Sequence, residues 1–165
     1  MSALLTALNA RLSRWALYLA CGSLAGLLIV VVYGVIRRYV FNEAPPYVEQ
    51  AALLLVISVA MFGASAQVRD AGHIGLDSLV RRLPPRIQAS CHAAIQVLQV
   101  VFALALIVGG AKMALSTAAT TIPTLGISEA FRYLPVVTAG VLIALFSIEH
   151  LVAAAAGREV TPSWH

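Results

Sequence analysis

The side chains of this sequence that could do chemistry in an apolar environment fall in two places. One is Glu149 beside His150, within an otherwise apolar run. The other is a set of polar residues whose spacings of four, four and three place them on one face of a helix: Gln88, His92, Gln96 and Gln99. Ionisable groups are costly in such surroundings, so these residues mark either a functional path or hydrogen bonds between helices.

Hydrogen bonding between helices is the simpler interpretation, because polar side chains commonly join helices inside membranes. Glu149 would then pair with Arg69 or with His92. Two alternatives remain open. His92 and His150 fall at similar depth and could hold a haem in an electron-transfer bundle. Glu149 could instead be the proton-binding carboxylate of a small proton-coupled exporter, although it lies near one end of its run.

Four long apolar runs must position these residues. They cover about 15–36, 50–68, 87–111 and 133–156. Among eleven Lys and Arg and seven Asp and Glu, only Glu149 lies well inside a run. A helix that crosses a bilayer needs about 20 mostly apolar residues, and every run has that length. The sequence therefore predicts an all-α integral membrane protein, a single domain of four transmembrane helices.

The composition argues against an enzyme. The chain is 61% hydrophobic and 11% charged, whereas a soluble domain has about 25% charged residues. Four spans and their connections use almost all of the 165 residues, so no soluble catalytic domain fits beside them. The net charge of +4 is spread over connections and ends, which fits membrane lipids and not nucleic acid. No cofactor is expected, and His73 with two nearby Asp lacks the ligand spacing of a metal site.

The middle connection predicts a short amphipathic helix that lies on the membrane surface. Leu and Val recur at helical spacing over residues 76–83, while Arg81 and Arg82 can point away from them. Pro84 and Pro85 end this helix and begin the third span.

The distribution of Lys and Arg predicts the orientation of the chain. Seven lie at the two ends and in the middle connection, and four lie in the first and third connections. The side with more positive charge faces the cytoplasm. Both termini are therefore predicted to be cytoplasmic, with connections 37–49 and 112–132 on the outer side.

Short motifs in the connections resemble those of a known family. They are Arg38-Tyr39-Val40-Phe41-Asn42, Tyr47-Val48-Glu49-Gln50, Gly72-His73-Ile74-Gly75-Leu76-Asp77, Leu125-Gly126-Ile127-Ser128 and Tyr133-Leu134-Pro135. In this order they resemble the small membrane subunit, the Q subunit, of tripartite ATP-independent periplasmic (TRAP) transporters, over about residues 11–155. Two positions depart from that family, which often has Trp where this chain has Tyr47 and a second Glu where it has Gln50.

The resemblance implies a supporting role in sodium-coupled uptake of a solute, commonly an organic acid. A periplasmic binding protein would deliver the solute to a large membrane subunit, which would bind both solute and sodium. The small subunit would be a static scaffold in the bacterial inner membrane, and its outer connections would be the contacts for the periplasmic protein. The positions that match the family's motifs are Arg38, Tyr39, Phe41, Asn42, Tyr47, Glu49, Gly72, His73, Asp77, Leu125, Gly126 and Pro135.

Overall fold

The computed structural model describes residues 3–70, 85–124 and 126–155, and helices dominate these ranges. The helices are α1 (Ala3–Val40), α2 (Pro46–Asp70), α4 (Pro85–Ser116) and α5 (Leu134–Ala155), with a 3-10 helix, η1 (Glu129–Tyr133), just before α5. In the part of the chain that the structure describes, four helices are long and apolar enough to cross a membrane, which confirms the predicted membrane architecture. The surface helix predicted at 76–83 lies outside the described residues, as do Gly72, His73, Asp77 and Leu125.

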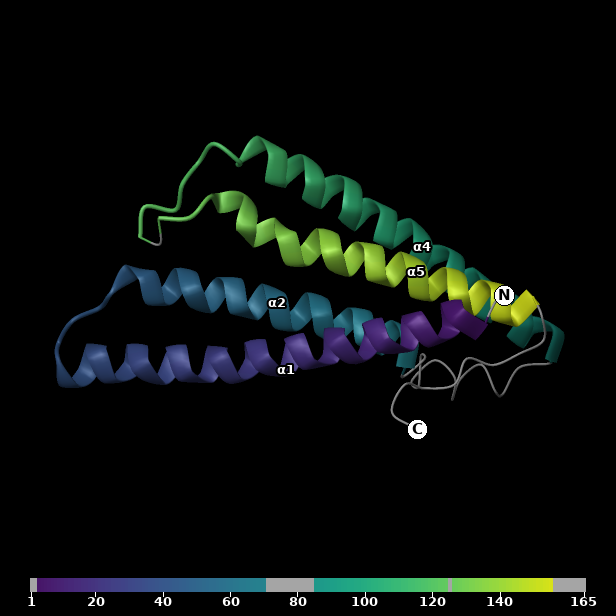
Figure 1. Cartoon of the computed structure of the whole chain (residues 1–165), viewed down its shortest axis with the longest axis horizontal. Helices are drawn as coiled ribbons and strands as arrows, with labels where there is room; N and C mark the ends of the chain where they lie inside the picture. Colours follow the sequence, from purple (N-terminus) through teal and green to yellow (C-terminus); the bar gives the residue numbers. More distant parts are fainter. Residues whose placement is uncertain (1–2, 71–84, 125, 156–165) are drawn as a thin grey trace.

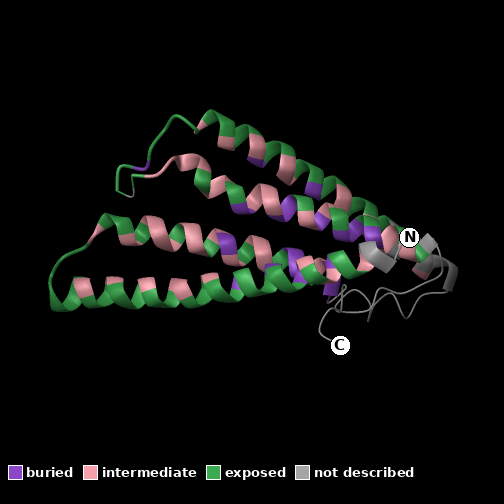
Figure 2. Ribbon diagram, in the orientation of Figure 1, coloured by how far each residue is buried: buried purple, intermediate pink, exposed green. Residues whose placement is uncertain are grey.

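The four helices form two hairpins that meet along their inner members. Helix α1 packs against α2, α4 packs against α5, and α2 contacts α5. Figure 1 shows the hairpins converging at the end where the N-terminus lies and separating toward their loops. In α2 the buried residues lie toward the converging end, whereas α5 has buried residues along most of its length (Figure 2). Arg69, Asp70 and Glu149, which are buried, lie where the hairpins converge.

The helices extend beyond the apolar runs that predicted them. At about 1.5 Å per residue, α1 with its 38 residues is longer than the hydrocarbon layer, which is about 30 Å thick. Its first turns are rich in Ala and Leu, which favour helix, so it begins at Ala3 rather than near Trp15. Helix α4 likewise continues to Ser116 through another stretch of good helix formers. The extra turns of α1 bring residues before Trp15 into the bundle.

The loop between α1 and α2 is short and follows from its residues. Asn42 adopts the left-handed conformation, with φ 54°, and Asn tolerates this better than most residues do. Pro46 occupies the first position of α2, where its missing N–H costs nothing. Arg37 forms an ion pair with Glu43 and lies over the ring of Phe41, 5.5 Å from its centre. These contacts close the hairpin.

The face of α1 that packs inward repeats in steps of four and three residues. Asn9, Ser13, Ala16 and Ala20 are buried. This spacing keeps side chains on one seam when two helices cross at a shallow angle, and small residues let the helices approach closely. The buried face of α1 therefore starts with two polar residues and continues with small apolar ones.

Candidate functional site

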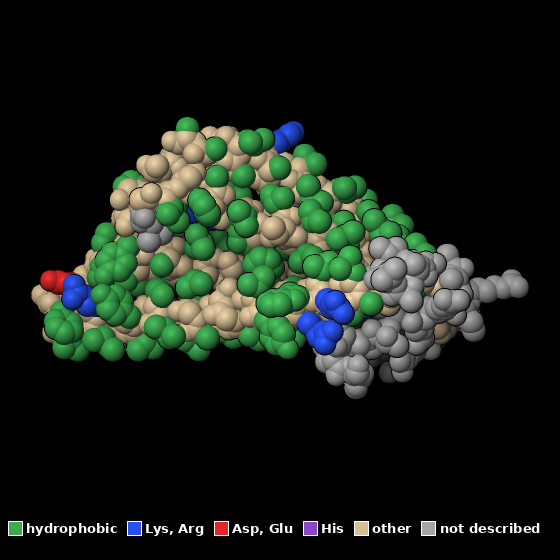
Figure 3. All heavy atoms as spheres, viewed as in Figure 1, with side chains coloured by type: hydrophobic (Ala, Val, Ile, Leu, Met, Phe, Trp, Pro, Cys, Tyr) green, Lys and Arg blue, Asp and Glu red, His purple; other side chains and the backbone are tan. Residues whose placement is uncertain are grey.

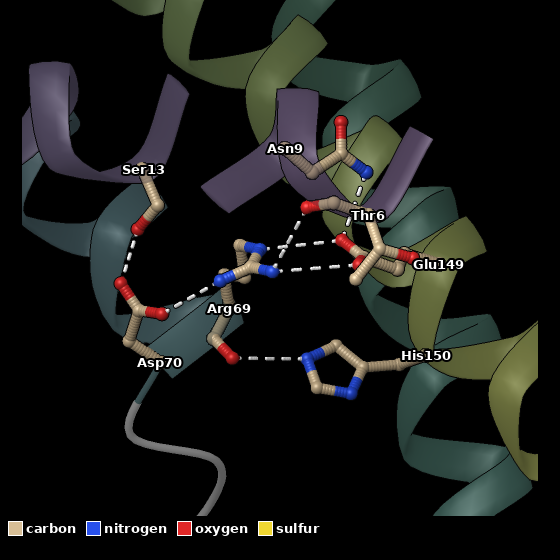
Figure 4. A network of polar contacts seen from close by, with 7 residues as sticks. All are labelled: Thr6, Asn9, Ser13, Arg69, Asp70, Glu149 and His150. Carbon is tan, nitrogen blue, oxygen red and sulfur yellow. Dashed lines mark hydrogen bonds and ion pairs between the residues drawn. The ribbon is translucent and has the colours of Figure 1, made fainter. Parts of the chain in front are cut away.

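The described part of the chain has one deeply buried ionic network, at the converging end of the bundle. It joins the first turns of α1, the last turn of α2 and the last two turns of α5 (Figure 4). The side chains of Arg69, Asp70 and Glu149 are each only 1% exposed. Arg69 lies at the centre of the network.

Arg69 donates two hydrogen bonds to Glu149. Its Nε donates to Oε2 of Glu149 at 3.3 Å and its Nη2 donates to Oε1 at 3.4 Å. Asn9 on α1 adds a third donor, since its Nδ2 lies 2.8 Å from Oε2 of Glu149. A guanidinium that binds both oxygens of a carboxylate also fixes its orientation. Of the two partners expected for Glu149, the structure thus shows Arg69.

The same guanidinium reaches the other side of the network. Its Nη1 donates to Oδ1 of Asp70 at 3.0 Å, and its Nη2 lies 3.4 Å from the main-chain oxygen of Thr6. The hydroxyl of Ser13 donates to Oδ2 of Asp70. Arg69 therefore ties three helices together, because its partners come from α1, α2 and α5.

His150 contacts the network through the main chain. Its Nε2 lies 3.2 Å from the carbonyl oxygen of Arg69. Because a carbonyl oxygen only accepts, this nitrogen carries the hydrogen. Nε2 of His150 is thus engaged in a contact between α5 and α2, which weakens the interpretation of His150 as a haem ligand. The side chain of His92, the other expected ligand, lies outside the described residues.

The glutamine stripe of α4 has contacts separate from those of Glu149. Gln99 accepts a hydrogen bond from Ser147 of α5 at 3.4 Å. The Oε1 atom of Gln96 is buried and has no hydrogen-bond partner among the described residues, and Gln88 is half-buried. The structure therefore places Gln99 between α4 and α5, and Glu149 between α5, α2 and α1.

Three side chains of the ionic network were not predicted from the sequence. Asn9 and Ser13 precede the first apolar run, and Asp70 follows the second run, which ends at about residue 68. One signal was present, since Asn9 and Ser13 continue the spacing of Ala16 and Ala20 toward the N-terminus. Polar residues that extend a seam of small residues indicate a helix longer than its apolar run.

The network can hold helices together and offers little for a metal. Within residues 3–70, 85–124 and 126–155, no three His, Cys, Asp or Glu side chains gather as metal ligands would. Both carboxylates instead accept hydrogen bonds from Arg69 and from neutral donors on α1. Such pairing satisfies buried charges inside the bundle. The geometry is that of a structural clamp.

The described residues that match the family's motifs lie mainly at the opposite end, near the loops. Arg38, Tyr39, Phe41, Asn42 and Glu49 are exposed there. The phenol oxygens of Tyr47 and Tyr33 are 2.9 Å apart, which joins α2 to α1. Pro135 is buried at the start of α5, and Gly126 has a positive φ of 65° in the second loop.

A second polar link joins the hairpins near these loops. Nη2 of Arg132 in η1 donates to Oε1 of Gln50 in α2 at 2.8 Å, and its Nη1 lies 3.3 Å from Oε1 of Glu129. The hydroxyl of Ser128 caps η1 by accepting from the main-chain N–H of Ala130. Gln50 is thus the position through which α2 contacts the α4–α5 loop.

Replacing Gln50 with Glu should stabilise the link to Arg132. The new carboxylate would face a guanidinium that already lies at hydrogen-bond distance. Since Arg132 is partly exposed, we expect a gain of at most about 1 kcal/mol in the free energy of unfolding. Unfolding by SDS in mixed micelles measures it, with Glu49→Gln, at an exposed neighbouring position, as the control. A loss of stability in Gln50→Glu would contradict the observed contact.

Comparison with known proteins shows which family the chain belongs to. Residues 27–157 match the DctQ component of tripartite ATP-independent periplasmic transporters. The chain belongs to this family. It is 26% identical over 138 residues to a Haemophilus influenzae protein with the provisional name TRAP transporter small permease protein, covering 83% of this chain and 86% of that protein. It is 23% identical over 128 residues to the sialic acid TRAP transporter small permease protein SiaQ of Vibrio cholerae, covering 78% and 74%.

Membership confirms the resemblance found in the connecting motifs. This small TRAP permease subunit is a transport component and a multi-pass protein of the inner membrane. The matched range includes Arg69 and Glu149, and it begins after Asn9 and Ser13. The α1 members of the ionic network therefore lie outside the matched residues.

Proposed function

We propose that this subunit is a static scaffold for a large membrane transport subunit, which takes up an organic acid together with sodium. The observation that carries the proposal is the ionic network. Arg69 and Glu149 are buried, and they pair with one another instead of facing a path through the bundle. A subunit whose buried charges lock its helices together is suited to resist movement.

The outer faces of the helices supply the surface that a scaffold needs. Most large apolar side chains of α1 are exposed, whereas α5 buries Ile143 and Phe146. Large apolar side chains therefore cover the outside of α1, and also of α4, where Leu98, Phe102 and Leu115 are exposed. Lipid and the large subunit would share these faces.

The proposed orientation places the loop end of the bundle in the periplasm and both termini in the cytoplasm. This rests on the excess of Lys and Arg at the ends and in the middle connection. Exposed residues at this end, among them Tyr39 in the last turn of α1 and Phe41 in the first loop, would then be available to a periplasmic binding protein. Sodium and solute would bind to the large subunit.

Reconstitution tests this function. The subunit is purified with the multi-span protein and the periplasmic protein encoded beside it, and uptake into proteoliposomes is measured for an organic acid that the periplasmic protein binds. We expect uptake to need all three proteins and a sodium gradient. Uptake that is equally fast without this chain would contradict the proposal. Flux by this chain alone would favour the exporter, and a haem absorption band would favour the electron-transfer bundle.

A further inference from the structure

A basic and aromatic surface lies on the part of α1 near the ionic network. It consists of Arg11, Arg14, Trp15 and Tyr18, all of which are exposed, with Trp15 at 66% and Tyr18 at 65%. The two rings contact each other edge to face, with their centres 6.3 Å apart. Figure 3 shows basic side chains beside hydrophobic ones at this end of α1. We call these four residues the Arg–Trp surface.

The Arg–Trp surface points away from the bundle. At about 100° per residue, each of its members lies about 200° around the helix from a buried residue two positions away. Arg11 and Trp15 flank buried Ser13 in this way, and Arg14 and Tyr18 flank buried Ala16. Spacings of three and four residues also bring the four side chains together on that outward face.

The charge of this surface is unbalanced. Helix α1 contains no Asp or Glu. In the part of the chain that the structure describes, Arg11 and Arg14 have no hydrogen bond or ion pair, unlike Arg37 and Arg69 on the same hairpin. Two exposed guanidiniums without a partner among the described residues fit an anionic group from outside the chain.

The position of the Arg–Trp surface in the membrane indicates that this anionic partner is a phospholipid. Residues 15–36 rise about 33 Å as a helix, close to the thickness of the hydrocarbon layer, so Arg14 lies at the level of the headgroups. Trp and Tyr favour that level because their rings are apolar and their N–H or O–H stays polar. Guanidiniums bind phosphate through paired hydrogen bonds. We propose that the Arg–Trp surface is a binding site for an anionic phospholipid such as phosphatidylglycerol, whatever the function of the subunit.

Quenching of Trp15 fluorescence tests this proposal. The chain has two Trp, so Trp164→Phe leaves Trp15 as the single reporter. The full-length protein is placed in phosphatidylcholine vesicles with equal fractions of phosphatidylglycerol or phosphatidylcholine brominated near the headgroup. We expect phosphatidylglycerol to quench more strongly, and each of Arg11→Gln and Arg14→Gln to lower its relative association by up to about fivefold. Circular dichroism confirms that the variants keep their helices.

The matched control is Arg38→Gln, an exposed arginine at the other end of the same helix. It should leave the preference at Trp15 unchanged. Equal quenching by both lipids in the parent protein would overturn the proposal. So would an equal loss in Arg38→Gln, which would indicate a general effect of charge. Weak quenching by both lipids would also overturn it, because something other than lipid would then cover this face.

Discussion

The Arg69→Met variant is expected to lose about 3–5 kcal/mol of its free energy of unfolding, the largest effect of any substitution proposed for this chain. Removing the guanidinium leaves Glu149 and Asp70 without their shared cation, and both carboxylates are 1% exposed. It also removes the link between α1, α2 and α5. Met has a similar length, so lost charge pairing and not lost volume dominates the effect.

Unfolding by SDS in mixed micelles measures this loss. Arg11→Met is the control, because Arg11 is exposed at the same end of the bundle and should change stability by less than about 0.5 kcal/mol. The double variant Arg69→Met/Glu149→Gln should lose less free energy of unfolding than the sum of the losses in the two single variants. Each single variant leaves the other residue buried without its partner, and the double variant does not. Additive losses would show that Arg69 and Glu149 do not interact.

Gly140→Ala should destabilise the α4–α5 hairpin by about 1–3 kcal/mol through overpacking. A methyl group at Gly140 would lie 2.9 Å from Cγ1 of Ile107 and 3.2 Å from the main-chain oxygen of Ala103. The main chain of α4 cannot move aside as a side chain could. The two helices would have to separate, and the contact between Gln99 and Ser147 lies on the same interface.

Gly109→Ala is the matched control for Gly140→Ala. A methyl group at Gly109 would meet no described atom within 4 Å apart from the adjoining backbone of its own helix, and Gly109 is exposed. Replacing a helical Gly by Ala normally stabilises a helix by about 0.5–1 kcal/mol. The two substitutions make the same chemical change, so opposite effects on the SDS midpoint are expected. Equal effects would contradict the close approach of α4 and α5.

The spans were predictable because the physical requirement is simple. A helix in lipid must be long and apolar, and the runs at about 15–36, 50–68, 87–111 and 133–156 met that requirement. The ends of the helices were less predictable. Helix α1 continues to Ala3 through good helix formers, and Asn9 and Ser13 in these turns contact α5 and α2. A hydropathy pattern reveals neither helix propensity nor tertiary packing.

Only part of the ionic network could be predicted from the sequence, for a related reason. Glu149 stood out as an acid within an apolar run, and Arg69 was one of two partners considered for it. Asn9 and Ser13 are neutral and are 140 and 57 residues from the carboxylates that they contact. Their role depends on three helices meeting at one place, which no local pattern encodes.

The measurement that bears most directly on the static scaffold is uptake by a complex whose hairpins have been locked. A Cβ at position 34 would lie 3.8 Å from Cβ of Val48, within the range for a disulfide, so Gly34→Cys/Val48→Cys can fix α1 to α2. Gly110→Cys/Val136→Cys can fix α4 to α5, since a Cβ at position 110 would lie 3.7 Å from Cβ of Val136. Val137→Ala makes room for the second lock, because Cγ2 of Val137 would lie 2.9 Å from the new Cβ.

Both native cysteines, Cys21 and Cys91, are free and are replaced with Ala first. The locked subunit is reconstituted with its large partner and the periplasmic protein, and sodium-driven uptake is compared before and after reduction of the disulfides. A static scaffold predicts the same rate in both states. Uptake that stops in the oxidised complex and returns on reduction would show that the helices of this subunit move during transport, and would contradict the scaffold.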